Sequence, residues 1–249
     1  VAAVTALLGS QMKSAGRLVM QAQGHGPLRL LMVDCDEQLR LRGVAKAPLD
    51  LQPGPPARLF GDGQLVLTLQ GKGQPYQSFV PLEGSTMTAV FENYLQLSAQ
   101  EPARLWLAAS ETAACALLLQ KLPAPETQGE GAAAAVQDLW EEATALMGTL
   151  GGDELLACEP QELLRRLFGA HDIRLFDGES VHFECRCSRE RVASMLRGLG
   201  QAEVDSIIAE QGAVSVTCEF CQRPYRFDVV DAQRLFLSPS GVADPGSIN

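Results

Sequence analysis

The sequence has no excess of positive charge and no long apolar run. It carries 20 Lys and Arg against 30 Asp and Glu, a formal net charge of −10, which argues against a nucleic-acid backbone as the main partner. No apolar run approaches the roughly eighteen residues that a membrane span requires, and no secretory signal peptide is visible. We therefore expect a protein of the reducing cytosol, without a membrane or a nucleic acid among its partners.

Recognisable catalytic and nucleotide-binding patterns are also missing. Residues 24–26, 61–63 and 71–73 each read G-x-G, but none completes the G-x-G-x-x-G of a dinucleotide-binding loop. We interpret these glycines as turn residues. No Ser/His/Asp or Cys/His set, pair of catalytic carboxylates or phosphate-binding loop stands out in the spacing, so the sequence gives no specific case for an enzyme.

The sequence does contain two tight pairs of cysteines. Four of its seven cysteines form a C-x-C and a C-x-x-C, namely Cys185 with Cys187 and Cys218 with Cys221. A tetrahedral Zn²⁺ prefers four soft, deprotonated ligands, and two cysteine pairs at this separation are typical of a four-sulfur zinc site. Arginines close in sequence favour the thiolate forms. We predict that these four cysteines bind one Zn²⁺ per chain.

The C-x-C pair is tighter than the usual zinc-knuckle spacing. In an extended backbone Cys185 and Cys187 project from one face, with Cα atoms roughly 6.5 Å apart. A relaxed disulfide needs a Cα separation of about 4.4–6.8 Å, so zinc bridges these sulfurs more easily than they bond each other. Two readings stay open: zinc is a static staple for a domain with a thin core, or metal loss, oxidation and unfolding are coupled.

The remaining cysteines and histidines carry no comparable pattern. Cys35, Cys115 and Cys158 lack paired spacing, and we interpret them as packing or incidental thiols. His182 lies three residues before Cys185 and is an alternative ligand, but four thiolates already complete a tetrahedron. In the region 181–236 seven arginines are balanced by eight acidic residues, which disfavours a DNA-binding zinc finger.

Hydrophobic periodicity predicts an α+β fold whose first domain is mainly antiparallel. Two hairpins are expected around the turns at 24–27 and 71–73. Helices are expected near 1–13 and 86–98, and residues 105–109 and 115–122 are expected to be strands that complete the sheet. Further on we predict amphipathic helices at 136–150 and 160–169, a hairpin of 173–176 with 181–185, helices at 188–199 and 202–211, and a hairpin of 213–218 with 225–230.

Composition divides the chain. A shift to Pro, Gly, Glu and Ala at 123–135 marks a boundary, and the predicted segments are a core domain at 1–124, a helical linker at 125–177, a zinc-binding domain at 178–238 and a disordered tail at 239–249. The linker helices either dock permanently on the first domain or form a metastable element that undocks. We expect the first domain to lack its native N-terminus.

Several segments resemble the heat shock protein 33 family, the bacterial redox-regulated holdase chaperones. The segments that carry the resemblance are F-E-C-R-C-S-R-E-R (183–191), E-V-D-S-I-I-A-E-Q-G (203–212), C-E-F-C-Q-R-P-Y-R-F (218–227), L-R-G-V-A (41–45), G-D-G (61–63), Y-Q-S-F-V-P-L-E-G (76–84) and A-L-M-G-T-L-G-G-D-E-L-L (145–156). The resemblance implies that the four cysteines bind zinc when reduced. It further implies that oxidation forms the disulfides Cys185–Cys187 and Cys218–Cys221, releases the linker and activates the chaperone in the bacterial cytoplasm. Unfolded client proteins are the implied partners, with a homodimer in the oxidised state.

Two other classes of function remain as alternatives. A static zinc module for protein or nucleic-acid binding would keep its metal and its activity under mild oxidation. A thiol–disulfide oxidoreductase would use Cys218 and Cys221 as a redox pair, but no thioredoxin-like βαβ setting surrounds that motif.

Overall fold

The computed structural model describes residues 1–12, 16–99, 102–123 and 130–237. The chain divides into two compact units, Val1–Glu184 and Cys185–Asn249. The predicted disordered tail at 239–249 lies outside the described residues, as does part of the predicted boundary at 123–135. The sequence-based limits of the core, linker and zinc domains describe segments that should fold independently. A division into compact units does not test independent folding, so these limits stay predictions.

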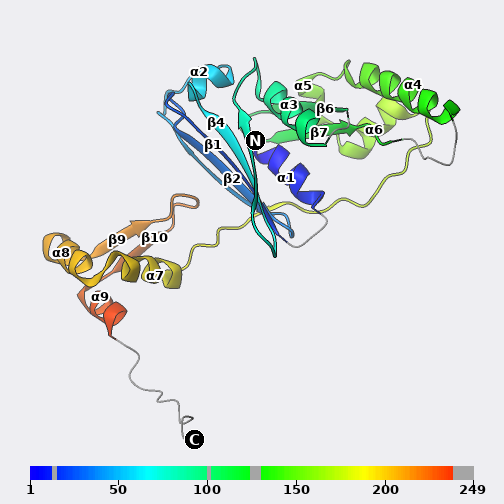
Figure 1. Ribbon diagram of the computed structural model, residues 1–249. Coiled ribbons are helices and arrows are strands. Elements are labelled where there is room, and N and C mark those ends of the chain that lie inside the picture. Colours follow the sequence, from blue (N-terminus) through cyan, green and yellow to red (C-terminus); the bar gives the residue numbers. More distant parts are fainter. Residues whose placement is uncertain (13–15, 100–101, 124–129, 238–249) are drawn as a thin grey trace, which may run out of the picture. The chain divides into compact units, whose positions relative to one another are not determined.

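A six-stranded sheet forms the first unit's framework, in the order β5-β4-β1-β2-β3-β8 (Figure 1). Every pairing is antiparallel except that of β3 with β8, which is parallel. Both predicted hairpins are confirmed, β1–β2 around the turn at 24–27 and β4–β5 around 71–73. The strands are β1 Arg17–Gln23, β2 Leu30–Asp36, β3 Arg40–Lys46, β4 Gln64–Gln70, β5 Tyr76–Pro81 and β8 His182–Phe183.

One face of this sheet carries the core. Alternate residues of β1 and β4, among them Met20 and Leu65, are fully buried on that face, as the period of two predicts. The helices α1 (Ala2–Ser10), α2 (Pro56–Phe60) and α3 (Met87–Ala99) add buried side chains such as Phe60 and Phe91 to the same cluster. The predicted helices at the N-terminus and near 86–98 are confirmed.

The strands β6 (Ala103–Ala109) and β7 (Ala114–Gln120) form a hairpin of their own. The two predicted strands are confirmed, but they form a separate sheet and do not complete the six-stranded one. Figure 1 shows α1 between this hairpin and the six-stranded sheet, and α1 packs on β2 and on β7. Alternation identifies a strand but does not say which sheet it joins, because a helix inserted between two apolar faces can satisfy both.

Three helices follow in the same unit: α4 (Glu130–Met147), α5 (Gly152–Ala157) and α6 (Pro160–Phe168). The first and third were predicted. The second was not, because Gly151 and Gly152 read as a stop; Gly151 instead has extended φ and ψ and serves as the N-cap of α5. Each helix buries one large apolar side chain, Met147, Leu155 and Leu163 respectively; α4 packs on α6, and α5 packs on β6 and β7. Within the described ranges, no helix combines the length and the hydrophobicity needed to cross a bilayer.

Residues 172–181 have no regular structure, so the predicted hairpin of 173–176 with 181–185 was wrong. The backbone N–H of His182 donates to the carbonyl of Leu39 (3.2 Å), and that of Glu184 donates to the carbonyl of Leu41 (3.1 Å). Residues 182–183 therefore pair with the open edge of β3 and not with the neighbouring residues 173–176. Local alternation could not foresee a partner more than a hundred residues away in the sequence.

Asp36 holds the turn that leads from β2 into β3. Its buried carboxylate accepts hydrogen bonds from the Arg40 side chain (Nε, 2.7 Å) and from the backbone N–H groups of Gln38 and Arg40 (3.1 Å each). Burial acts to raise the pKa of Asp36, but the hydrogen bonds from Arg40 and the two backbone groups outweigh it, so the pKa lies below its ordinary value.

Replacing Asp36 by asparagine should therefore destabilise the first unit in a pH-dependent way. A carboxyl whose pKa is lowered by folding stabilises above its unfolded pKa of about 3.9, and this contribution disappears as the pH falls through the folded value. We expect Asp36→Asn to lower the free energy of unfolding by about 1–3 kcal/mol at pH 7, and less below pH 4. Urea unfolding at both pH values measures this, with the exposed Asp50→Asn as control. If Asp36→Asn lowered the free energy of unfolding equally at both pH values, the stabilising role of the ionised Asp36 carboxylate would be contradicted.

Candidate metal centre

The second unit is a small α+β fold with its own core. Its elements are α7 Arg189–Leu199, α8 Gln201–Gln211, β9 Val214–Thr217, β10 Pro224–Phe227 and α9 Val229–Phe236. Seven buried residues form the core: Val192, Leu196, Val204, Val214, Tyr225, Phe227 and Ala232. Cys187 and Cys218 pack against this cluster, so the cysteines extend a core that is thin without them.

The first cysteine pair lies on the short stretch that enters α7. Ser188 follows directly and caps this helix, since its hydroxyl accepts from the backbone N–H of Arg191 (3.2 Å). The cap fixes the direction in which the chain leaves Cys187. The predicted helices at 188–199 and 202–211 are both confirmed.

The second pair lies on the turn between β9 and β10. The backbone N–H of Cys218 donates to the Arg223 carbonyl (3.0 Å), and that of Gln222 donates to the Cys218 carbonyl (2.8 Å). Gln222 has a positive φ of 60°, which folds the chain back sharply after Cys221. The turn thereby presents both sulfurs of the C-x-x-C on one side of the hairpin.

The four predicted cysteines come together. One sulfur from each of Cys185, Cys187, Cys218 and Cys221 lies within 4.8 Å of all the others. Two close contacts join the two pairs: Cys185 Sγ to Cys218 Sγ is 3.6 Å, and Cys187 Sγ to Cys221 Sγ is 3.3 Å. No disulfide links them. Tetrahedral zinc with bonds of about 2.3 Å places its sulfurs about 3.8 Å apart, so the four thiols fit one such ion.

The thiols influence one another strongly. The buried Tyr225 hydroxyl makes no hydrogen bond of ordinary geometry, yet it lies close enough to the Cys187 sulfur to be the largest influence on the pKa of that thiol, which is lowered. For Cys221 the backbone N–H of Arg223 acts to lower the pKa, but the Cys187 sulfur, burial and the other two sulfurs raise it to about 12. Four sulfurs this close cannot all ionise unless a cation lies among them, which is the chemistry of a soft metal site.

The other thiols take no part in this cluster. Cys35 is fully buried in the first unit, and burial, followed by Asp36 and Asp34, raises its pKa to about 11, as expected of a packing thiol. Cys115 and Cys158 lie elsewhere in the first unit. His182 belongs to β8, and among the described residues the metal-type cluster consists of the four cysteines without it.

The chain after β10 was mispredicted. The expected strand through Val230 ends at Phe227, because Asp228 and Asp231 form a capping box that begins α9. Asp231 also pairs with Arg189 (2.6 Å), whose guanidinium lies 4.2 Å from the centre of the Phe227 ring. A D-x-x-D before an apolar run was the available signal for this helix start.

Removing the cap of α7 should weaken the second unit. Ser188→Ala deletes the acceptor for the Arg191 N–H and should lower the free energy of unfolding of this unit by about 0.5–2 kcal/mol. Thermal unfolding of the reduced protein followed by circular dichroism measures it, with the exposed Ser206→Ala on α8 as the matched control. Equal stability of the two variants would show that the cap contributes nothing.

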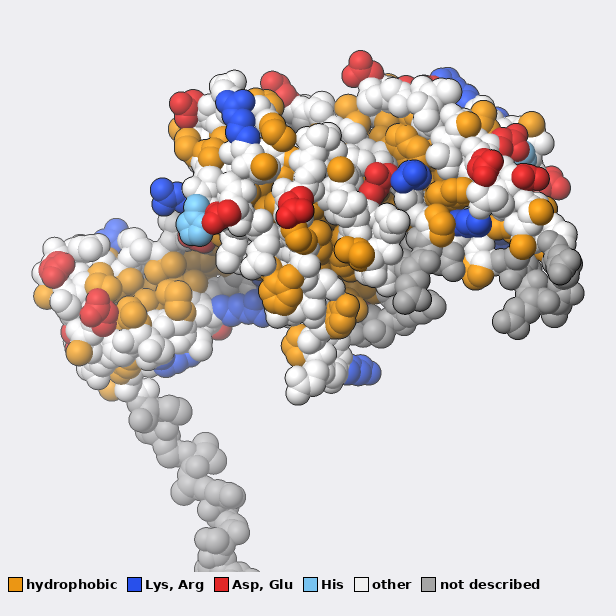
Figure 2. Space-filling model, turned by 45° about the horizontal axis from the view of Figure 1, so that its top comes forward, with side chains coloured by type: hydrophobic (Ala, Val, Ile, Leu, Met, Phe, Trp, Pro, Cys, Tyr) orange, Lys and Arg blue, Asp and Glu red, His pale blue; other side chains and the backbone are white. Residues whose placement is uncertain are grey.

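The face of the molecule seen in Figure 2 carries charges of both signs. On the visible face of each unit, basic and acidic side chains are scattered among hydrophobic ones and do not gather into a basic patch (Figure 2). This agrees with the net charge of −10.

Comparison with known proteins identifies the family. A family model described as Hsp33 protein matches residues 1–228. The 33 kDa chaperonin of Methylobacillus flagellatus is 40% identical over 239 residues, which are 95% of this chain and 80% of that protein. That of Nitrosococcus oceani is 40% identical over 235 residues, 94% of this chain and 78% of its relative. The crystal structure of a heat shock protein 33 homologue from Thermotoga maritima shares the fold, with a TM-score of 0.75, 20% identity and coverage of 94% of this chain and 82% of that one. The chain therefore belongs to the Hsp33 family.

Proposed function

We propose that this protein is a zinc-dependent, redox-switched holdase chaperone of the bacterial cytoplasm, which binds unfolding proteins and prevents their aggregation. The observation that carries the proposal is the cluster of four unbonded thiols from two distant segments, all within 4.8 Å of one another. Membership of a family whose relatives are named 33 kDa chaperonin supports the chaperone part.

In the reduced state Cys185, Cys187, Cys218 and Cys221 are the proposed ligands. When bound, one Zn²⁺ would hold the four thiolates together and supply folding free energy that the thin core lacks. Structural zinc contributes on the order of 10–16 kcal/mol in small peptides. The arginines near the cluster favour its anionic form, since the guanidinium of Arg223 senses the charges of both Cys187 and Cys221.

Oxidation would remove the ligands. Each disulfide forms when a pair of thiolates gives up two electrons, and one hydrogen peroxide takes up these electrons and two protons to become two water molecules. Two peroxides thus account for the two disulfides, which we propose to be Cys185–Cys187 and Cys218–Cys221. In the structure, sulfurs of different pairs also lie close together, at 3.6 and 3.3 Å, as expected of ligands around one ion. Sulfurs that enter disulfides no longer bind a metal, so the second unit loses its main stabilising contribution.

Unfolding of the second unit would free the segment that precedes it. Large apolar side chains are already exposed along this segment: Ile173, Leu175, Phe176, Val181 and Phe183. We propose that its release, together with loosening of α4–α6, makes apolar surface available to unfolded clients. Dimerisation of the oxidised form would enlarge that surface.

The proposal is tested by light scattering of a chemically unfolded client. The protein is added either reduced and zinc-loaded or after peroxide treatment at mildly raised temperature. We expect only the oxidised form to suppress aggregation. Equal suppression by both forms would leave a static binding module. Reduction of insulin disulfides at a rate that depends on Cys218 and Cys221 would instead favour an oxidoreductase.

A further inference from the structure

The outer edge of β3 is paired along a short stretch only. The carbonyls of Leu39 and Leu41 accept the two hydrogen bonds from β8. Since successive residues of a strand direct their backbone groups to opposite sides, the N–H and C=O groups of Gly43 and Ala45 face the same edge as Leu41. Both residues are exposed, and although β2 lies beside them on the inner side, no strand within the described part of the chain pairs with them on this outer edge. An unpaired edge of this kind is a template for a further strand.

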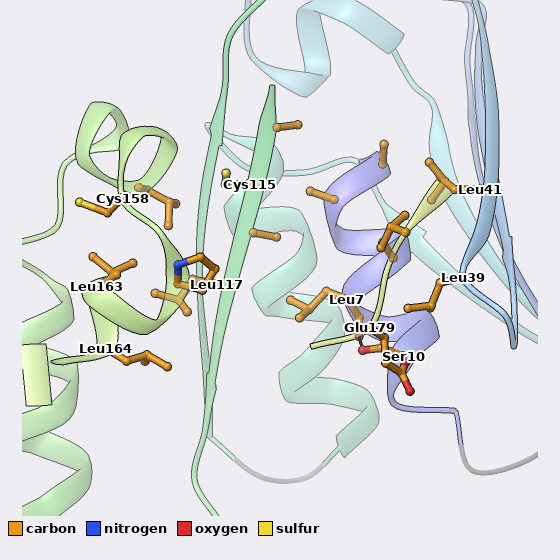
Figure 3. A pocket seen from close by; sticks show the side chains of 18 of the residues that line it. Leu7, Ser10, Leu39, Leu41, Cys115, Leu117, Cys158, Leu163, Leu164 and Glu179 are labelled. Carbon is orange, nitrogen blue, oxygen red and sulfur yellow. Dashed lines mark hydrogen bonds between the residues drawn. The ribbon is translucent and has the colours of Figure 1, made fainter. Parts of the chain in front are cut away.

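An apolar groove of about 780 Å³ leads to this edge. Figure 3 shows Leu7, Leu39, Leu41 and Glu179 at one end of the groove, and Cys158, Leu163 and Leu164 at the other. The chain itself passes along it: Asp177, Glu179 and Val181 line the groove, and the next residues form β8 on the β3 edge. Residues 177–184 thus occupy the groove and the edge in succession.

This internal occupant is loosely held. The side chains of Val181 and Phe183 are 50% and 61% exposed, so little apolar surface is buried by the segment. The contacts that hold it on β3 include the two backbone hydrogen bonds of β8 and an ion pair between Arg40 Nη1 and Glu184 Oε1 at 3.4 Å. The segment ends at Glu184, directly before the first cysteine of the metal centre. Its position therefore depends covalently on a unit that we propose to unfold.

We propose that the groove and the β3 edge form a binding surface for an extended segment of an unfolded polypeptide, which takes the place of residues 177–184 and continues as a strand along Gly43 and Ala45. This inference rests on the proposed holdase function and specifies its recognition mode. Main-chain hydrogen bonds to Gly43 and Ala45 impose no sequence requirement, and the groove accepts apolar side chains from alternate positions. A chaperone that serves many clients needs this combination.

The surface is tested by blocking the edge. Ala45→Pro removes an outward N–H, and edge strands tolerate proline; Ala45→Thr keeps the N–H and is the matched control. The probe is fluorescein-labelled, reduced and carboxymethylated α-lactalbumin, a permanently unfolded chain, titrated with the oxidised proteins and followed by anisotropy. We expect Ala45→Pro to raise the dissociation constant about fivefold or more, and Ala45→Thr to leave it unchanged.

A second pair of variants displaces the internal occupant. His182→Pro deletes the backbone N–H that donates to the Leu39 carbonyl. Phe183→Pro is the control, because it introduces a proline ring at a residue whose backbone N–H faces away from β3. Reduced, zinc-loaded His182→Pro should bind the probe about fivefold more tightly than reduced wild type, with Phe183→Pro unchanged. Zinc content and thermal unfolding verify that each variant is folded.

The outcomes separate the two proposals. If the oxidised wild type does not bind the probe, the holdase function fails. If it binds, and folded Ala45→Pro binds equally well, the strand-addition surface is overturned while the holdase function stands. Should Ala45→Pro not fold, reduced His182→Pro binding no better than reduced wild type overturns the surface on its own.

Discussion

Replacing Cys218 by serine should abolish stoichiometric zinc binding and unfold the second unit of the reduced protein. Cys218 contributes one of four sulfurs that lie within 4.8 Å of each other, and its side chain also packs on the small core. Serine offers a hydroxyl that is a poor ligand for zinc at neutral pH. We expect the zinc affinity to fall by more than a hundredfold, and the unit to lose most of a metal contribution on the order of 10 kcal/mol.

Zinc content and far-ultraviolet circular dichroism of the reduced proteins measure this effect. The matched control is Cys158→Ser, which changes a partly buried thiol outside the cluster and should leave one zinc per chain. The expected spectrum of Cys218→Ser lacks the helical signal of α7–α9. Full zinc occupancy in that variant would show that the four cysteines do not form the site.

Truncating Met147 should activate the reduced protein without removing its zinc. Met147 is the last residue of α4, which packs on α6, and is 2% exposed, so Met147→Ala leaves a cavity at its buried position and costs about 2–5 kcal/mol. If the linker helices are a metastable element whose release exposes apolar surface, this loss should shift the reduced protein toward the released state. We therefore expect partial suppression of client aggregation in the absence of oxidant.

Leu139→Ala is the control for this variant, because Leu139 lies on the same helix but is 51% exposed. It should leave both stability and activity of the reduced form unchanged. A Met147→Ala protein that is clearly destabilised, retains its zinc and stays inactive would show that α4 docking does not restrain the chaperone.

Local patterns predicted most of the elements. The period of two in β1, β2, β4 and β5, with glycine-rich turns between them, identified two hairpins whose pairing the structure confirms. The amphipathic periodicity of α4 and α6 likewise reflects a buried face against a solvated one. These features depend on neighbours in sequence, so a local pattern contains the information.

What the sequence could not predict depends on partners far along the chain. The hairpin β6–β7 is separate from the six-stranded sheet because α1 packs between the hairpin and that sheet. His182 and Phe183 pair with β3 rather than with residues 173–176. In both cases the local sequence indicated a strand. The sheet edge or helix face against which that strand packs belongs to a distant segment of the chain.

The clustering of the four cysteines was the most predictable feature of the candidate site. Thiolate ligands are rare, and their spacing reflects the turn geometry that brings each pair onto one ion, so residue type and position alone named Cys185, Cys187, Cys218 and Cys221. The influence of Tyr225 on Cys187 could not be foreseen, because it depends on how β10 returns past the first pair.

The most direct test of the redox switch follows metal release and client protection in one sample. Reduced, zinc-loaded protein is treated with peroxide, and aliquots are taken over time. In each aliquot a chromogenic chelator reports free zinc, and light scattering of an unfolded client reports activity. We predict that one zinc per chain is released with the same time course as the appearance of activity, and that both return to their starting values after reduction with zinc present. Full activity reached while zinc stays bound to the four cysteines would contradict the account.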